Sequence, residues 1–210
     1  MGTLNNRCVI IGGGETTTEF ILENLKNDDF VICADSGYDY LVDTNIVPNL
    51  IIGDFDSIKN KSLSVDTITL PVEKDITDTQ AAFEKGKAKG YSDFLLLGGT
   101  GGRFEHTFAN IAVMASATCK GIGFEIIDEK HHFYCVHNSS ISIKKGDNEQ
   151  VSVFAFGCVA KGVSEKGMYY SLDNAELSPF DHIGISNHIV DDFGTISVEN
   201  GTLIIIKTKM

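Results

Sequence analysis

The pattern of apolar and polar positions in residues 1–128 indicates alternating strands and helices. Several of the short runs are apolar throughout, which is typical of strands covered on both faces in a parallel sheet. We expect strands at Cys8–Ile11, Phe30–Ala34, Leu50–Ile52, Thr67–Leu70, Phe94–Leu97 and Phe124–Ile127. We expect helices at Glu15–Lys26, Tyr38–Thr44, Thr79–Lys89 and Phe104–Thr118. This alternation predicts an α/β domain on a mainly parallel sheet.

The pattern changes after His131, where helical spacing ends and turn residues separate short apolar runs. Asn200-Gly201 is a strong turn signal and predicts a hairpin. We expect strands at His132–Val136, Ser140–Ile143, Val151–Ala155, Met168–Leu172, Gly184–Val190, Gly194–Val198 and Thr202–Lys207. This pattern predicts a small β-sandwich. We therefore expect two domains: a Rossmann-like α/β domain at 1–129, and an all-β domain at 130–210.

Charge and cysteine content narrow the function classes. The formal net charge is −12, which argues against sequence-independent nucleic-acid binding because that needs clustered Lys and Arg. It equally argues against an anionic membrane surface, and no apolar stretch reaches the roughly 18 residues of a membrane span. The five cysteines are widely spaced, with no CxxC pair. Four of the five lie in apolar runs, which favours reduced thiols buried in the core of a cytoplasmic protein.

Two acids follow the third expected strand. Asp54 and Asp56 are two residues apart, which in an extended chain puts both side chains on one face, about 7 Å apart at Cα. Two such carboxylates can share a Mg²⁺ ion, and ligands of open α/β sheets bind beyond the carboxyl ends of the strands. The alternative is a solvated acidic turn.

A second acidic motif, Lys74-Asp75-Ile76-Thr77-Asp78, opens an expected helix. Asp75 and Asp78 are three residues apart and share a helical face. The alternative is helix capping, because Thr77 and Gln80 fit a capping box. Capping explains Thr77, but it does not account for Lys74 beside Asp75.

A glycine-rich loop, Gly98–Gly102, lies between a strand and a helix. Such a loop lets backbone N–H groups approach phosphate oxygens at a helix N-terminus, and Arg103 adds a cation that can bind bidentately. A flexible connector is the alternative; neither the Walker A nor the dinucleotide-binding spacing is present. Gly12–Gly14 and Asp35 also follow strands, and Asp35 is a candidate ligand, substrate acceptor or N-cap.

Taken together, acids, glycines and one arginine are expected at one edge of the parallel sheet. This combination suits Mg²⁺-dependent phosphate chemistry, because the metal and Arg103 offset phosphate charge. The remaining alternatives are a Mg²⁺-dependent nucleotide phosphohydrolase or nucleotidyltransferase, and a non-catalytic sensor of a nucleotide or another small molecule.

Several motifs resemble the thiamine pyrophosphokinase family of the bacterial type. They are Ala34-Asp35-Ser36-Gly37, Pro48–Ser57, Lys74–Asp78, Gly98–His106, Gly167–Leu172 and Gly184–Asn187. The resemblance runs in family order from about residue 9 to 207. Ser36 stands where the family usually has glycine, and Glu105 where it usually has aspartate.

The resemblance implies that ATP and thiamine give AMP and thiamine diphosphate in one pyrophosphoryl transfer. It also implies a homodimer, with thiamine bound between subunits. The implied metal ligands for Mg²⁺ are Asp54, Asp56 and Asp78. The implied ATP-binding residues are Lys74, Asp75, Thr77, Gly98, Gly99, Thr100, Gly101, Gly102, Arg103, Glu105 and His106. The implied catalytic residues are Asp35, Asp54, Asp56, Asp78 and Arg103, and the implied thiamine-binding residues are Ser186, Asn187 and Asp35.

Overall fold

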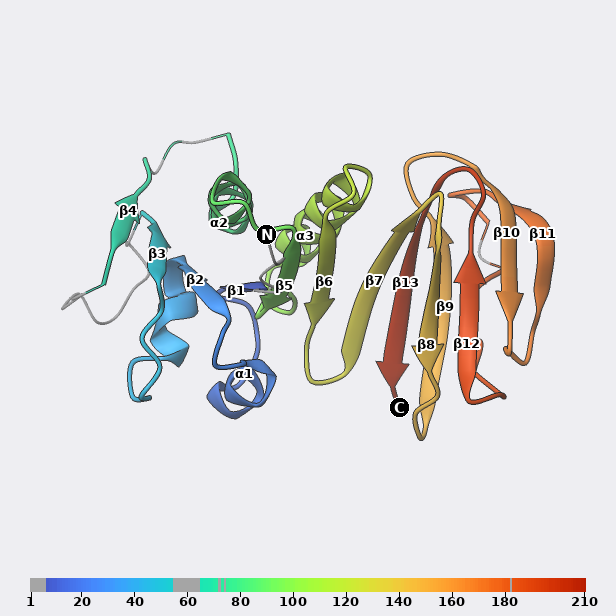
Figure 1. The fold of residues 1–210 in the computed structure, drawn as a ribbon, viewed down its shortest axis with the longest axis horizontal. Helices are drawn as coiled ribbons and strands as arrows, with labels where there is room; N and C mark the ends of the chain where they lie inside the picture. The colour runs from blue at the N-terminus through green and yellow to red at the C-terminus, as the bar shows by residue number, and fades with distance from the viewer. Residues whose placement is uncertain (1–6, 55–64, 72, 74, 182) are drawn as a thin grey trace, which may run out of the picture. The chain divides into compact units, whose positions relative to one another are not determined.

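The computed structural model describes residues 7–54, 65–71, 73, 75–181 and 183–210. Contacts divide the chain into two compact units, Met1–Val113 with Ile122–Glu129, and Met114–Gly121 with Lys130–Met210. The first unit is α/β and the second carries seven strands (Figure 1). The expected fold class, an α/β part followed by an all-β part, is confirmed at this level.

The first unit is built on a parallel sheet. Its strands lie in the order β4-β3-β2-β1-β5-β6, and every printed pairing among them is parallel. All six expected strands are present, so the apolar runs predicted this sheet correctly. The strands are β1 (Cys8–Ile11), β2 (Phe30–Ala34), β3 (Leu50–Gly53), β4 (Thr67–Thr69), β5 (Asp93–Leu97) and β6 (Gly123–Ile127).

Helices cover both faces of the sheet (Figure 1). On one face, Ile21 of α1 packs with alternate strand residues such as Val9 and Ile11. On the other face, Phe83 of α2 contacts Phe94 and Phe124, with ring centroids 4.9 and 5.4 Å apart. Burial on both faces explains why these strands are apolar throughout. The helices are α1 (Thr18–Asn24), the 3₁₀ helix η1 (Asp35–Tyr40), α2 (Asp78–Ala88) and α3 (Phe104–Thr118).

The second unit has two antiparallel sheets. One has the order β7-β13-β9 and the other β11-β10-β12-β8. The strands are β7 (His131–His137), β8 (Ser140–Lys144), β9 (Glu149–Ala155), β10 (Ala160–Lys166), β11 (Leu172–Leu177), β12 (Phe193–Ser197) and β13 (Thr202–Lys209).

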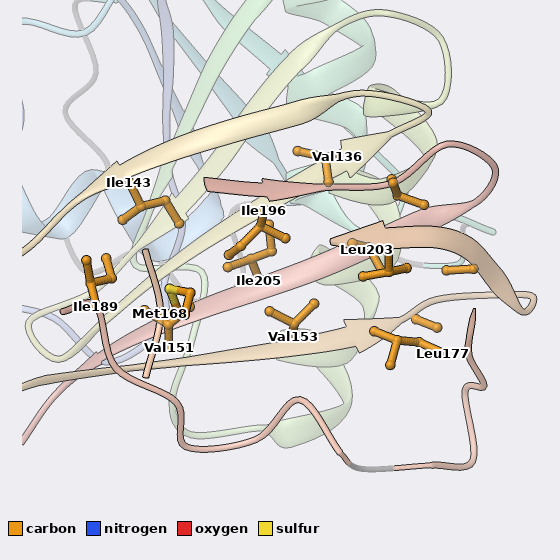
Figure 2. Packing of buried hydrophobic residues seen from close by; sticks show 14 residues of the cluster. Val136, Ile143, Val151, Val153, Met168, Leu177, Ile189, Ile196, Leu203 and Ile205 are labelled. Carbon is orange, nitrogen blue, oxygen red and sulfur yellow. The ribbon is translucent and has the colours of Figure 1, made fainter. Parts of the chain in front are cut away.

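One hydrophobic core joins the two sheets of this unit (Figure 2). Val151 and Val153 come from β9 and Leu203 and Ile205 from β13, while Ile196 comes from β12 of the other sheet. Buried side chains alternate with partly exposed ones along β9, as expected for a strand that packs one face against the core.

Three expectations for the second unit are wrong. The segments expected as strands at Met168–Leu172 and Gly184–Val190 are mostly irregular and make only single bridges, Met168 with Ile189 and Asn187 with Val151. Strands β10 and β11 form instead on either side of the first segment. The Asn200-Gly201 turn does not close a hairpin, because β12 and β13 belong to different sheets.

The expected helix at Tyr38–Thr44 is also wrong, because the chain forms the 3₁₀ helix η1 slightly earlier. Gly37 allows η1 to lie close against β1, because a Cβ there would lie 2.0 Å from the Ile11 carbonyl oxygen. The helix α1 is shorter than expected and begins after Thr17, whose Oγ1 accepts a hydrogen bond from the N–H of Phe20 at 3.2 Å.

All five cysteines are free, but only Cys8 and Cys33 are fully buried, whereas Cys119 and Cys158 are exposed. The interpretation of the thiols as core residues is therefore wrong for the exposed pair. Within the described ranges, no helix combines the length and apolarity that crossing a membrane requires.

Candidate active site

Two glycine loops meet at the carboxyl edge of the parallel sheet. The N–H groups of Gly12 and Gly14, after β1, donate to the carbonyls of Leu97, the last residue of β5, and of Gly98, which follows it, both at 2.8 Å. The contact requires glycine, because a Cβ on Gly12 would lie 2.6 Å from the Gly98 carbonyl oxygen. The two loops therefore form one structure.

This meeting point lies where the strand order reverses. β1 pairs with β2 on one side and with β5 on the other. The chain thus proceeds in opposite directions across the sheet from this point. In open α/β sheets, ligands bind in the crevice outside the carboxyl ends at such a point.

A pocket of about 410 Å³ opens at this edge. It collects most of the predicted residues of the first unit, from three separate loops. Of the predicted site residues, those that line it are Asp35, Thr77, Asp78, Gly98, Gly99, Thr100, Gly101, Gly102, Arg103 and His106. Among the described residues, Asp54, Asp75 and Glu105 were also predicted but do not line this pocket. Asp56 and Lys74 lie outside the described residues.

The position of Asp78 follows from helix capping. Thr77 is the N-cap of α2 and its Oγ1 accepts a hydrogen bond from the N–H of Gln80 at 3.2 Å. Asp78 is then the first helical residue, where the partial positive charge of the helix N-terminus stabilises a carboxylate. Capping and a functional role are therefore compatible for this motif.

Asp35 reaches the pocket through an unusual backbone conformation. Its φ is +48°, a left-handed value that is uncommon for residues other than glycine but tolerated by aspartate. Such strain often occurs at functional sites. Nearby, the Tyr40 hydroxyl donates to the Gly14 carbonyl at 2.6 Å, which ties η1 to the first glycine loop.

Arg103 brings a positive charge to the pocket. Its side chain is 73% exposed, and its Nε donates to Glu105 Oε1 at 2.7 Å. The hydrogen bond from Arg103 lowers the pKa of Glu105. An exposed ion pair of this kind contributes little to stability, so Arg103 can exchange it for a phosphate at small cost.

Glu15 and Asn110 are among the pocket residues that were not predicted from the sequence. Glu15 Oε1 accepts a hydrogen bond from the N–H of Gly102 at 3.0 Å, and buried Asn110 donates through Nδ2 to the Gly99 carbonyl at 2.8 Å. Asn110 could have been found, because it is a polar residue within the apolar part of α3. No sequence signal marked Glu15.

The charges of the pocket fit a divalent cation. Among the described residues that line the pocket, Glu15, Asp35 and Asp78 are acids and Arg103 is the one arginine, so these residues alone do not neutralise a polyphosphate. No group of three or more potential His, Cys, Asp or Glu ligands occurs in the part of the chain that the structure describes. Mg²⁺ needs no such group, since it binds through one or two carboxylates together with waters and substrate phosphates. The carboxylate oxygens present are suitable donors for it.

The remaining predicted residues, Ser186 and Asn187, lie in the second unit. Ser186 is exposed and has φ +58°. Asn187 is buried, and its side chain bonds to Glu165 and to the backbone of Tyr170. Tyr169 and Tyr170, close by, are 61% and 64% exposed. This part of the second unit therefore presents aromatic and polar groups to solvent.

Comparisons with known proteins agree over both halves of the chain. Residues 21–126 match the family described as thiamin pyrophosphokinase, catalytic domain. Residues 138–203 match the family described as thiamin pyrophosphokinase, vitamin B1 binding domain. The thiamine pyrophosphokinase of Bacillus subtilis strain 168 is 26% identical over 215 residues, which cover 99% of each protein.

Solved structures of this family share the fold. The crystal structure of thiamine pyrophosphokinase from Bacillus subtilis has a TM-score of 0.88 at 24% identity, covering 98% of this chain and 99% of that one. The structure of the Geobacillus thermodenitrificans protein has a TM-score of 0.84 at 22% identity and covers 98% of both chains. Because the catalytic-domain match alone spans half of the sequence and the second match follows it in order, this chain belongs to the thiamine pyrophosphokinase family.

Proposed function

We propose that this chain transfers the pyrophosphoryl group of ATP to the hydroxyl of thiamine, giving thiamine diphosphate and AMP. The observation that carries this proposal is the pocket at the β1–β5 edge. It brings Asp35, Asp78 and Arg103 to a glycine loop, within a chain whose halves match the catalytic and vitamin B1 binding families.

The parallel sheet is proposed to bind ATP in the Rossmann-like manner, at the carboxyl ends of its strands. Gly98, Gly101 and Gly102 have positive φ, and loops of this kind can direct backbone N–H groups toward an anion. Arg103 then adds a bidentate cation for the phosphates. The further proposed ATP contacts are Lys74, Asp75, Thr77, Gly99, Thr100, Glu105 and His106.

Magnesium is the proposed metal, held by Asp54, Asp56 and Asp78. Asp78 is supported by its place in the pocket, and Asp54 by its position directly after β3. When bound, the ion would neutralise charge on the transferred phosphates.

The reaction needs positioning and charge stabilisation more than covalent help from the protein. The thiamine hydroxyl oxygen forms a bond to the β-phosphorus, and the bond from that phosphorus to the oxygen of the α-phosphate breaks. The hydroxyl proton passes to a carboxylate of the acidic set, for which Asp35 and Asp78 are the candidates in the pocket. AMP leaves with the bond electrons, and Arg103 stabilises the developing charge.

The second unit is proposed to bind thiamine, so that 1–129 serve as the catalytic domain and 130–210 as the thiamine domain. Exposed Ser186 is the proposed direct contact, with Asn187 beside it and Asp35 from the catalytic domain. We further propose a homodimer with thiamine between subunits, and a cytoplasmic location, where ATP is available. Neither nucleic acid nor a membrane is an expected partner, given the net charge of −12.

One incubation tests the reaction. Purified protein is mixed with ATP, Mg²⁺ and thiamine, and nucleotides and thiamine species are separated by chromatography. We expect AMP and thiamine diphosphate in equal amounts, only when all three are present. Nucleotide loss without thiamine would indicate a phosphohydrolase or nucleotidyltransferase instead, and binding without product would indicate a sensor.

A further inference from the structure

Glu165 is a buried acid in the core of the second unit. It lies on the central strand β10, between β11 and β12, and is 1% exposed. One carboxyl oxygen, Oε2, accepts a hydrogen bond from Asn187 Nδ2 at 2.9 Å, while Oε1 is buried and has no hydrogen-bond partner. Burial raises the pKa of this carboxyl, against the opposing effect of the Asn187 hydrogen bond. Burying an incompletely bonded carboxyl costs free energy, so its presence needs an explanation.

Stability alone does not supply that explanation. Replacing buried ionisable groups by apolar residues of similar volume is often neutral or stabilising. The cross-strand partners of Glu165 are both aliphatic, Leu172 on β11 and Ile196 on β12, and Ile196 belongs to the hydrophobic core. What the acid provides, and an apolar residue cannot, is an acceptor for Asn187.

Asn187 uses all of its hydrogen-bonding capacity inside the protein. Its Nδ2 donates to Glu165 Oε2 and, at 2.7 Å, to the Tyr170 carbonyl. Its Oδ1 accepts from the N–H groups of Tyr170 and His188, both at 3.0 Å. An amide side chain offers two donors and two acceptor positions, so no position is left for a ligand. The contribution of the Asn187 side chain to thiamine binding is therefore indirect: it holds the backbone of its neighbours.

The backbone that Asn187 holds carries exposed aromatic rings. Tyr169 stacks on His188, with centroids 4.7 Å apart, and makes an edge contact with Tyr170 at 4.9 Å. One bridge, Met168 with Ile189, joins these two segments to each other, and one, Asn187 with Val151, joins them to β9. The Tyr169 N–H also donates to the His188 carbonyl at 2.9 Å. The four hydrogen bonds of the Asn187 side chain add to this backbone order. Exposed Ser186 precedes Asn187 directly in the chain.

We propose that Glu165 is a positioning residue for the thiamine substrate. It does not touch the substrate. It fixes the Asn187 amide, which keeps the Tyr169–Tyr170 and Ser186–His188 segments in one arrangement before the substrate arrives. This inference rests on the proposed function, and it assigns the role to a residue that the sequence motifs do not include.

Two substitutions at one position separate positioning from packing. Glu165→Met keeps the approximate volume and removes the acceptor, while Glu165→Gln keeps an acceptor oxygen for Asn187. Glu176→Met is the matched control, because Glu176 lies on the neighbouring strand β11 with its side chain 63% exposed. For each protein the KM for thiamine, the KM for ATP, kcat and the melting temperature are measured.

We expect Glu165→Met to raise the KM for thiamine about tenfold, with the KM for ATP within about twofold. The melting temperature should stay within about 4 °C of the wild type, because relief of the buried carboxyl offsets the Asn187 donor left without its acceptor. Glu165→Gln should keep the KM for thiamine within about threefold of the wild type. The control Glu176→Met should change neither the KM for thiamine nor the KM for ATP. A lower melting temperature with both KM values unchanged would reduce Glu165 to a packing residue and overturn the proposal.

Amide hydrogen exchange gives a second measurement that needs no turnover. The N–H groups of Tyr170 and His188 both donate to Asn187 Oδ1, so Glu165→Met should speed their exchange about tenfold, and Glu165→Gln should do so less. Unchanged exchange would contradict the proposal. A wild type that makes no thiamine diphosphate would instead remove the proposed function, and this inference with it. An active wild type with an unaffected Glu165→Met variant would remove the inference alone.

Discussion

Removal of the Asn110 side chain tests how the glycine loop is held. Asn110 is 5% exposed on α3, and its Nδ2 donates to the carbonyl of Gly99, which is itself buried. In a planar trans peptide the carbonyl and the next N–H point in opposite directions. Anchoring the Gly99 carbonyl toward α3 therefore turns the N–H of Thr100 away from that helix. Asn110 thus orients a peptide of the pocket without being a loop residue.

The expected loss of stability follows from the burial of the Gly99 carbonyl. Asn110→Ala leaves the Gly99 oxygen without its donor, which costs about 1–3 kcal/mol of unfolding free energy. For a chain of this length, about 2 kcal/mol corresponds to a melting temperature lower by roughly 4–8 °C. Asn110→Asp should cost more at neutral pH, because a carboxylate of the same shape cannot donate and repels the carbonyl.

The assay combines thermal unfolding with ATP kinetics. Ser116→Ala is the control, since Ser116 is an exposed residue on the same helix and such changes stay within about 0.5 kcal/mol. Asn110→Ala should also raise the KM for ATP by about threefold or more, as the loop peptide loses its orientation. A variant as stable as Ser116→Ala, with an unchanged KM for ATP, would refute the reasoning.

Three further outcomes follow from the described residues. Arg103→Lys should lower kcat/KM for ATP at least about tenfold with an unchanged melting temperature, because a point charge cannot replace the bidentate guanidinium and the Arg103 side chain is 73% exposed. Burial raises the pKa of Glu165 above its ordinary 4.5. Between pH 4.5 and the raised pKa, the native state therefore binds a proton that the unfolded state has lost. The unfolding free energy of the wild type should then fall relative to that of Glu165→Gln as pH rises from about 4.5 through the native pKa. Melting temperatures of both proteins measured across this pH range would show the difference. Ellman's reagent should label exposed Cys119 and Cys158 in the native protein but reach buried Cys33 only after unfolding.

The parallel sheet could be predicted from the sequence because burial on both faces leaves long apolar runs. The position of the candidate site at the carboxyl edge of that sheet could be predicted too, since glycines and acids directly follow the strands. The pocket shows Asp35, Asp78 and Arg103 on one cavity, which agrees with that reasoning. Their chemical roles stay predictions.

The missed features depend on contacts between distant segments. Glu15 reaches the N–H of Gly102 across 87 positions, and no local pattern encodes such a contact. The 3₁₀ helix η1 depends on the close approach of Gly37 to Ile11. Asn200-Gly201 has the chemistry of a hairpin turn, but the flanking strands bury their apolar faces in two different sheets, and that burial outweighs the turn preference.

The failure to predict β10 has a more specific cause. Along this strand the buried positions are Ala160, Val163 and Glu165, so an acid occupies an inward position where alternation requires an apolar residue. Bulges in the pairing with β11 disturb the alternation further. Where one residue breaks the local sequence pattern of its strand, the protein loses some stability, and such positions tend to be functional or strained. Glu165 is thus both the residue that breaks the apolar pattern of β10 and the residue whose carboxyl group accepts the hydrogen bond from Asn187. The variants Glu165→Met and Glu165→Gln test whether this acid is kept for that hydrogen bond.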